Sequence, residues 1–266
     1  MDNQANQPNE TQQNALNGKQ LFPFIAPPNG GKGTQTAILS THFNLPIVDM
    51  GACLRDIVRK WKEGKLSEAA DQTLAKTVDE AQSKGELVQT PIVIKVLEAT
   101  IKQLLAQFPQ TNGFILDGFP RNIEQLDALI GMCKQTGANL AKAFYLNVPE
   151  DVVRSRASSR WFCSSCNAVY NLVSKPPKTQ GVCDKPHQAG EGKLIQRDDD
   201  KPEKVEKRLV SFANDTMPVI QTLKESGKLF EINGNQAPEP ITQALMQEMN
   251  PFLKAPVTSG TGNPQS

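Results

Sequence analysis

Apolar runs of strand length alternate along the chain with longer segments in which apolar residues recur at helical spacing. The first run, Leu21–Ala26, is followed by a glycine-rich turn and then by an amphipathic segment, Gln35–Phe43. The remaining strand-length runs, each separated from the next by helical stretches, are Pro46–Val48, Gly113–Leu116, Lys142–Val148 and Lys228–Ile232. This alternation predicts an α/β fold, a mostly parallel sheet flanked by helices on both faces.

One residue conflicts with this pattern. Pro23 lies inside the first run and cannot donate a hydrogen bond to a neighbouring strand, so we expect a late strand start or a bulge there.

Two intervals interrupt the alternation and predict inserts in the core. Residues 49–88 contain two helical patterns with charged faces, Leu54–Lys62 and Leu66–Lys84, and predict a helical insert. Residues 161–197 hold a Cys-x-x-Cys pair, two adjacent prolines and several glycines, which predicts a small β-rich insert. The core domain is then formed by residues 21–48, 89–160 and 198–250.

The two ends of the chain have the composition of segments without fixed structure. Residues 1–20 are rich in Asn and Gln, and residues 251–266 are rich in Pro, Gly, Ser and Thr, so we expect a disordered extension and a flexible tail. The first segment lacks the basic start and apolar centre of a secretory signal, and no apolar run is long enough to cross a bilayer. We therefore expect a cytoplasmic location and no membrane partner.

Charge and cysteine content exclude two further classes of protein. The chain has 29 Lys and Arg against 28 Asp and Glu, a net charge of +1, which argues against binding nucleic acid through a general basic field. Its five cysteines are an odd number, and two of them stand apart from the others, which argues against a disulfide scaffold. Because the net charge is close to zero, any site for an anion must be formed by a local group of basic residues and N–H groups.

The glycine-rich turn is a candidate phosphate site. Such a turn between a strand and a helix directs backbone N–H groups and the positive end of the helix at one point, and Lys32 adds a full charge. The pattern is incomplete because Ala26 stands at the first glycine position and Asn29 where a flexible residue is expected. Asn tolerates a left-handed backbone and Ala adds only a methyl group, so the loop can still close. An ordinary glycine-rich turn is the alternative.

Three motifs together resemble the adenylate kinase family. They are Gly30-Gly31-Lys32-Gly33-Thr34-Gln35, Leu116-Asp117-Gly118-Phe119-Pro120-Arg121 and Gln196-Arg197-Asp198-Asp199. The resemblance runs from about Leu21 to Leu253 and is to the long form with a cysteine-bearing lid. It implies a monomer that transfers a phosphoryl group reversibly from Mg·ATP to AMP, giving two ADP, in adenine nucleotide homeostasis. Residues 49–88 would be the mobile flap over AMP and residues 161–197 the lid over ATP.

The resemblance also implies the site residues. ATP would be bound by Asn29, Gly30, Gly31, Lys32, Gly33, Thr34, Arg156, Arg160 and Tyr170, although a core tyrosine is an equal alternative for the last. AMP would be bound by Met50, Arg55, Glu86, Leu87, Val88, Gly118, Arg121, Gln125, Arg197 and Arg208. The catalytic groups would be Lys32, Arg121, Arg156, Arg160, Arg197, Arg208 and Asp117, with Asp117 organising Mg²⁺ through water. Because the acceptor oxygen is already anionic, such a site needs aligned positive charge more than a base.

Departures from the family pattern leave two other functions open. Asp49-Met50-Gly51-Ala52 replaces the usual Ser-Thr-Gly-Asp and removes a hydroxyl that meets the AMP base in the family, so another nucleoside monophosphate is a possible acceptor. The altered phosphate loop leaves open a nucleotide-binding relative without catalysis. Retention of the lysine, the aspartate and all six arginines favours an active enzyme.

The remaining three cysteines form a candidate metal site. Cys163-x-x-Cys166 followed by Cys183 has the spacing of a tetrahedral zinc site whose fourth ligand is expected near residue 186, which is proline. His187 can complete the set, and Asp184 is a weaker candidate. The alternatives to structural zinc are a remnant site of packed thiols and a Cys163–Cys166 redox pair.

Overall fold

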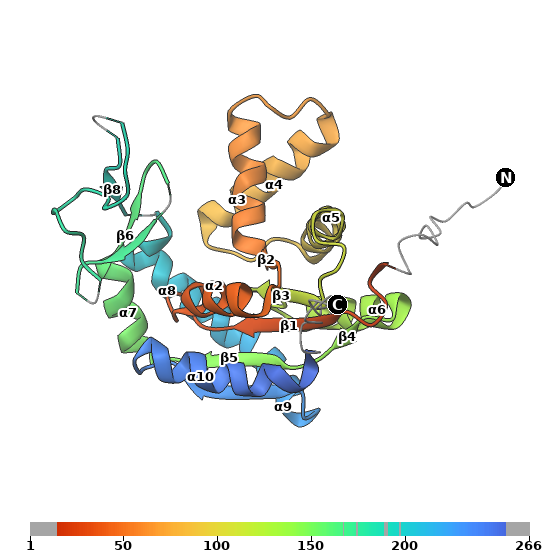
Figure 1. Ribbon diagram of the computed structural model, residues 1–266. Coiled ribbons are helices and arrows are strands. Elements are labelled where there is room, and N and C mark those ends of the chain that lie inside the picture. Colours follow the sequence, from red (N-terminus) through yellow and green to blue (C-terminus); the bar gives the residue numbers. More distant parts are fainter. Residues whose placement is uncertain (1–14, 167, 174, 189–190, 197, 254–266) are drawn as a thin grey trace, which may run out of the picture.

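The computed structural model describes residues 15–166, 168–173, 175–188, 191–196 and 198–253. Its larger sheet is parallel, with strand order β2-β3-β1-β5-β9, and a short strand, β4, pairs with β1 (Figure 1). The strands are β1 (Gln20–Ile25), β2 (Ile47–Asp49), β3 (Gly113–Asp117), β4 (Asn139–Leu140), β5 (Ala143–Asn147) and β9 (Leu229–Asn233). The α/β fold predicted from the alternating pattern is confirmed, and the two-residue β4 was not predicted.

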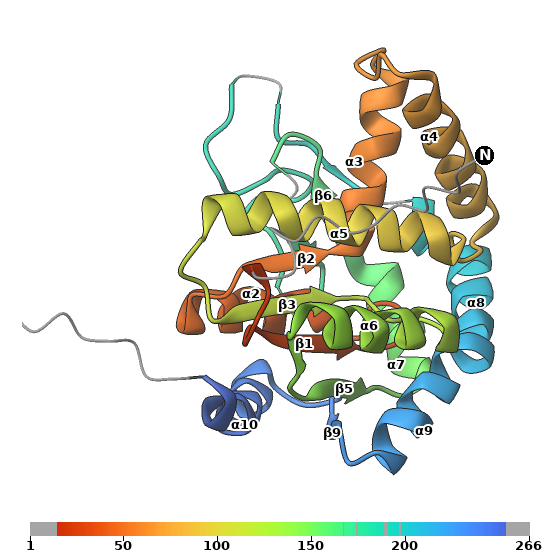
Figure 2. The same cartoon turned by 90° about the vertical axis from the view of Figure 1, so that its right-hand side faces the viewer.

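Helices cover both faces of this sheet (Figure 2). On one face, side chains such as Leu21, Phe114 and Tyr145 pack against α5 (Thr90–Gln107), α6 (Ile123–Thr136) and α9 (Met217–Glu225). On the other face, Phe22 and Phe144 pack against α2 (Lys32–Phe43) and α10 (Pro238–Met249). Successive strand residues point to opposite faces, so a strand buried on both faces has a nearly continuous apolar sequence.

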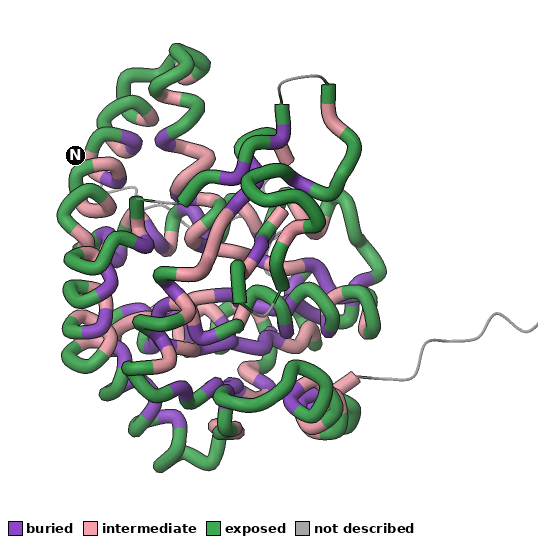
Figure 3. Tube along the Cα trace, turned by 90° about the vertical axis from the view of Figure 1, so that its left-hand side faces the viewer, coloured by how far each residue is buried: buried purple, intermediate pink, exposed green. Residues whose placement is uncertain are grey.

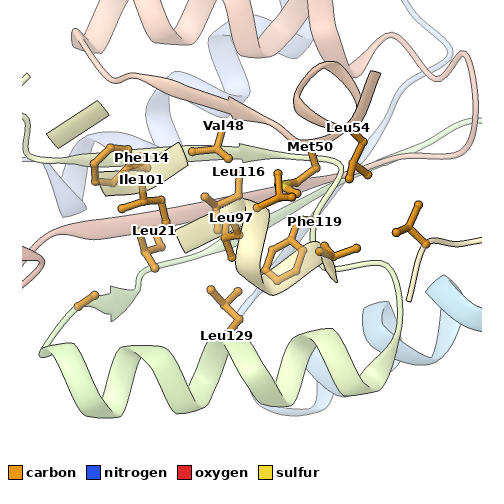
Figure 4. Packing of buried hydrophobic residues seen from close by; sticks show 14 of the residues in the cluster. Leu21, Val48, Met50, Leu54, Leu97, Ile101, Phe114, Leu116, Phe119 and Leu129 are labelled. Carbon is orange, nitrogen blue, oxygen red and sulfur yellow. The ribbon is translucent and has the colours of Figure 1, made fainter. Parts of the chain in front are cut away.

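Figure 4 shows the first of these layers from close by. Leu21, Phe114 and Leu116 on the strands meet Leu97 and Leu129 on the helices, and Phe119, at the turn after β3, closes the cluster. Leu21, Leu97, Phe114, Leu116, Phe119 and Leu129 have no exposed surface. This packing fixes the turn that follows β3, where predicted site residues lie.

Pro23 lies in the middle of β1, opposite Leu116 of β3. On the other side of β1 the ladder is interrupted: from Leu21 to Phe24 the strand advances three residues, while its partner advances four, from Leu140 to Phe144. The extra residue lies on the neighbouring strand, between β4 and β5, beside the proline, which has no N–H to donate. β1 itself begins before Pro23 and keeps its register with β3 through it, so the late start or bulge expected in that strand was wrong.

Two inserts stand away from the sheet (Figure 1). One consists of α3 (Met50–Lys62) and α4 (Ala69–Lys84), and the other of a three-stranded antiparallel sheet, β6 (Arg160–Cys163), β7 (Val169–Asn171) and β8 (Leu194–Ile195), reached through α7 (Glu150–Ser159). The chain returns through a 3₁₀ turn (Asp198–Asp200), α8 (Pro202–Ser211) and a π-helical turn, η2 (Phe212–Thr216). Exposed stretches dominate the outer parts of both inserts, whereas buried stretches follow the central strands (Figure 3).

The predicted boundaries of the two ends were wrong by several residues. Leu16 is buried in the core, Gly18 donates its N–H to the carbonyl of Gly137 at 2.9 Å, and β1 already begins at Gln20. At the other end, Asn250–Phe252 form a 3₁₀ turn, and the ring of Phe252 lies edge-on to Phe22 with centroids 6.2 Å apart. The polar composition of each terminal segment as a whole gave no sign that Leu16 and Phe252 pack against the core. The rest of both predicted segments lies outside the described residues.

Within the described part of the chain, no helix is both long and apolar enough to cross a membrane.

Candidate active site

The candidate site lies at the carboxyl ends of the central strands, where ligands bind in open α/β sheets. The loop Ala26–Gly31 leaves β1, and Asp49 and Asp117, which end β2 and β3, are paired in the sheet. The parallel strands thus bring the phosphate loop, Asp49 and Asp117 to one edge of the sheet.

The phosphate loop closes in the way that its sequence allows. Asn29 has φ 57° and Gly31 φ 85°, both left-handed, and Gly30 donates its N–H to the carbonyl of Pro27 at 3.0 Å. A methyl group added at Gly30 would lie 2.9 Å from Cβ of Ala26, so the extra methyl of Ala26 fills space that only a glycine at residue 30 leaves free. Gly31 precedes α2, and no described side chain caps that N-terminus. Its first N–H groups are therefore available to an anion.

Asp117 is held by two residues of α2. It is buried at the end of β3, and its Oδ1 accepts a hydrogen bond from Nζ of Lys32. Its Oδ2 accepts one from Oγ1 of Thr36 at 3.0 Å. Lys32 and Thr36 lie one turn apart and so share one face of the helix. Thr36 lies outside the predicted motifs, and the one signal for it in the sequence is its spacing of four residues from Lys32.

The cationic side chains of Arg121 and Lys32 both lie close to Gly118. A methyl group at Gly118 would lie 3.1 Å from Nη2 of Arg121 and 3.7 Å from Nζ of Lys32. Arg121 also donates from Nε to the carbonyl of Gly118 at 3.0 Å. Burial lowers the pKa of the Arg121 guanidinium, and nearby Asp117 opposes that shift. A half-buried guanidinium held beside a lysine is a binding site for an anion.

Two side chains hold the backbone of Arg121. Its N–H donates to Oε1 of Gln125 at 2.8 Å, and its carbonyl accepts from Oγ1 of Thr216 at 2.9 Å. Gln125 and Thr216 are both buried. Gln125 was expected to bind AMP, and in the structure its amide oxygen accepts the hydrogen bond from the N–H of Arg121. Thr216 ends the π-helical turn and was missed, because the sequence carries no signal for that turn.

Arg208 and Arg160 extend the positive cluster. Burial, followed by repulsion from Arg121, lowers the pKa of Arg208 to about 10. Arg160 forms a bidentate ion pair with the buried Asp200, Nε to Oδ2 at 3.0 Å and Nη2 to Oδ1 at 2.5 Å. No sequence motif pointed to Asp200. Its carboxylate holds Arg160, the first residue of β6, against the 3₁₀ turn that precedes α8.

Arg156 and Arg55 approach two glycines of the site. Nη1 of Arg156 lies 3.7 Å from the position of a methyl group at Gly31, and its Nη2 donates to the carbonyl of Gly234 at 3.0 Å. Nη1 of Arg55 lies 3.0 Å from the corresponding position at Gly51. The structure therefore brings Arg156 to the phosphate loop and Arg55 to the first turn of α3. Arg197 lies outside the described residues.

The expected contact of Met50 with the acceptor base conflicts with the structure. Met50 is 3% exposed and packs in the core cluster that includes Phe119 and Leu54 (Figure 4). Asp49 accepts a hydrogen bond at 2.9 Å from the N–H of Ala52 and caps α3, a role for which Asp is well suited. The altered tetrapeptide is explained by helix capping and core packing.

Glu86 and Leu87, two of the residues expected to bind AMP, line a cavity of about 600 Å³. Gly85, Glu86 and Leu87 form one wall, and residues of α8 and η2, including Lys207 and Asn214, form the other. Val88 is buried in the core. The cavity thus lies between the helical insert and the π-helical turn that holds Arg121.

The Cys and His side chains predicted to bind metal converge in the small insert. The ligand atoms of Cys163, Cys166, Cys183 and His187 all lie within 4.8 Å of one another. Asp184 is not in this group, and its Oδ1 accepts a hydrogen bond from the N–H of Lys178. Burial opposes ionisation of Cys183, but hydrogen bonds led by that from Tyr170 outweigh it and lower the pKa of the thiol to about 6. Such a thiol is prepared to act as a metal ligand.

Tyr170 belongs to the interior of this insert. It is buried, its hydroxyl lies 3.3 Å from Sγ of Cys183, and the hydroxyl accepts a hydrogen bond from the N–H of Asp184 at 2.7 Å. These contacts agree with a core tyrosine, the alternative to the expected ATP contact.

Comparison with known proteins identifies the family of this site. A family model described as adenylate kinase matches residues 24–228. The chain is 37% identical over 211 residues to an adenylate kinase of Thermosipho africanus, covering 79% of this chain and 90% of that protein. It is 37% identical over 222 residues to one of Archaeoglobus fulgidus (84% and 94%) and 35% identical over 226 residues to one of Caldicellulosiruptor saccharolyticus (85% and 97%).

The parallel sheet, the phosphate loop and the cluster of half-buried cations define a nucleotide phosphotransferase. The chain belongs to the adenylate kinase family, as its three motifs predicted.

Proposed function

We propose that this chain transfers the γ-phosphoryl group of Mg·ATP to AMP, giving two ADP. The observation that carries the proposal is the convergence of Lys32 and Arg121 at Gly118, beside Asp117, with Arg208 close enough to Arg121 for repulsion between them to lower the pKa of Arg208. Burial disfavours the charged form of both arginines. Transferring phosphates would relieve that repulsion, so the site is electrostatically complementary to several anionic groups at once.

We assign the donor nucleotide to the loop side of this cluster. The N–H groups of Gly31 and Gly33 and the Lys32 ammonium would bind its phosphates, as the open start of α2 supports. Gly30 and Thr34 would shape the loop, because their N–H groups donate to the carbonyls of Pro27 and Gly31. Arg156, Arg160 and Arg197 would approach from the lid side. The residues present also fit Mg²⁺, because a buried carboxylate oxygen at a strand end is a donor that hard cations prefer. We therefore assign Asp117 to hold Mg²⁺ through water, and the ion would offset the charge developing on the phosphate oxygens.

We assign the acceptor to the side of the helical insert. Arg55 and Arg121 would bind the phosphate of AMP, Arg208 would approach the transferring group, and the backbone of Glu86–Val88 would contact the base. Because the attacking phosphate oxygen is already anionic, none of these groups needs to remove a proton. Their task is alignment and exclusion of water.

The test is ADP formation from ATP and AMP, with ATP alone as the check on hydrolysis. Lys32→Ala should abolish AMP-dependent turnover, and Lys95→Ala, on the exposed face of α5, serves as the matched control. Nucleotide binding without turnover in the unchanged protein would favour a non-catalytic relative. Equal rates with AMP, GMP, CMP and UMP would refute adenine specificity.

We also propose one structural zinc ion bound by Cys163, Cys166, Cys183 and His187. The support is a set of three sulfur atoms and one nitrogen atom close enough to surround one ion, a donor set typical of structural zinc. Metal analysis of protein purified without chelator should find zinc, and His187→Ala should lower its retention while His42→Ala does not. Absence of zinc together with three freely titrating thiols would reject the site.

A monomeric state and a cytoplasmic location are further proposals, which rest on the family resemblance. Sedimentation at several protein concentrations tests the first, and a mass that rises with concentration would contradict it.

A further inference from the structure

Thr36 makes a contact with Asp117 that the family motifs do not predict. Its side chain is 1% exposed, and its Oγ1 donates to Oδ2 of Asp117 at 3.0 Å. The other carboxylate oxygen, Oδ1, is bound by Lys32, one helical turn earlier. Each oxygen of the carboxylate therefore has its own partner on α2.

The threonine hydroxyl has one competing acceptor. A helical threonine can satisfy itself by donating to a carbonyl three or four residues earlier, and the carbonyl of Gly33 lies 3.3 Å from Oγ1. The carboxylate is closer and charged, and a charge-assisted hydrogen bond is roughly twice as strong as a neutral one. The hydroxyl therefore donates mainly to Asp117.

The two partners differ in what happens when nucleotide binds. In the proposed function the Lys32 ammonium turns to the phosphates and leaves Oδ1, whereas Thr36 is fixed inside the helix and keeps Oδ2. A carboxylate without the second bond would rotate, because the χ2 torsion of Asp is broad. The threonine thus determines which oxygen faces the phosphate loop.

We infer that Thr36 is a positioning residue that holds the Asp117 carboxylate so that Oδ1 is presented to hydrated Mg²⁺. This inference rests on the proposed role of Asp117. In this role Thr36 would act through Asp117, to which its hydroxyl donates.

The test measures nucleotide binding rather than turnover. Calorimetry gives the Kd of ATP with and without Mg²⁺, and the ratio of the two values is the Mg²⁺ enhancement. Thr36→Val removes the donor at nearly constant volume and should lower the enhancement about tenfold, because the hydrogen bond that orients the charged carboxylate is lost. Thr36→Ser should restore it. Thr41→Val, on the exposed face of α2, should leave it unchanged.

The variants separate failure of the inference from failure of the proposed function. Asp117→Asn should lose the enhancement, and if it does not, Asp117 has no role toward Mg²⁺. If Asp117→Asn loses it while Thr36→Val keeps it, the positioning role is refuted. An equal fall in affinity with and without Mg²⁺ in Thr36→Val would show a purely structural role and also refute the inference. Should the valine variant fail to fold, Thr36→Ala removes the same donor and is measured in its place.

Discussion

The contact between Ala26 and Gly30 makes the altered phosphate loop testable. A methyl group at Gly30 would lie 2.9 Å from Cβ of Ala26 and 3.0 Å from the carbonyl oxygen of Pro27. Ordinary contacts between carbon atoms are about 3.5–4.0 Å, so Gly30→Ala forces the loop apart by roughly 0.6–1.1 Å at the Ala26 contact. Overpacking of this kind costs about 1–3 kcal/mol of the free energy of unfolding.

Removing the methyl of Ala26 should offset much of that cost. By itself Ala26→Gly should destabilise by about 1 kcal/mol, through lost burial and added freedom of the unfolded chain. In the double variant the single methyl group has moved from residue 26 to residue 30, and one of the two close contacts disappears. We expect the double variant to be about 1–2 kcal/mol more stable than the sum of the single changes predicts.

Equilibrium unfolding in urea, followed by circular dichroism, measures all three variants. Gly33→Ala is the control, because a methyl there meets no atom within 4 Å, and it should be neutral or stabilising. A cost for Gly30→Ala below about 0.5 kcal/mol, or additivity within about 0.5 kcal/mol, would refute the steric reasoning.

Three further changes test contacts that hold the site in place. Gln35 accepts a hydrogen bond from α10 and donates one to it, so Gln35→Ala should cost about 1–3 kcal/mol in urea unfolding, and a cost below about 0.5 kcal/mol would contradict this. Asp200→Asn breaks the ion pair between the buried Asp200 and Arg160 and should lower the free energy of unfolding by about 2–4 kcal/mol. Glu206→Gln, in the exposed pair with Arg154, should lower it by less than about 1 kcal/mol, and equal losses would refute the distinction. Burial raises the pKa of Tyr145 to about 12, so the stability that this group contributes is complete below pH 10 and is lost as the pH rises toward 12. The unfolding free energy of Tyr145→Phe should therefore fall less steeply than that of the unchanged protein between pH 10 and 12. An equal slope would contradict the reasoning.

Local pattern was sufficient for most elements of the fold. The apolar runs around Leu116 and Phe144 predicted strands because strands covered on both faces have few polar positions. It failed at the two ends of the core, where the overall composition of each terminal segment is polar: Leu16 and Phe252 pack against the core, and only those contacts show why the chain is ordered there.

The residues of the site also divide into those that the sequence motifs predicted and those whose role only the packed structure shows. Lys32, Asp117 and Arg121 were found because a phosphate site needs these residue types at these positions in a strand–turn–helix order. The roles of Thr36 and Asp200 depend on partners 81 and 40 residues away along the chain, and the local sequence around each residue does not indicate such partners.

The sequence by itself therefore determined the fold class, the family and the charged groups of the site. Only the tertiary structure decided which side chains orient those groups and which are core. Met50 and Tyr170 have the chemistry to contact a base, and burial against Phe119 and beside Cys183 assigns them to the interior instead. The physical reason is that a residue type limits what a side chain can bind, whereas the neighbours brought together by folding determine which of those contacts it makes.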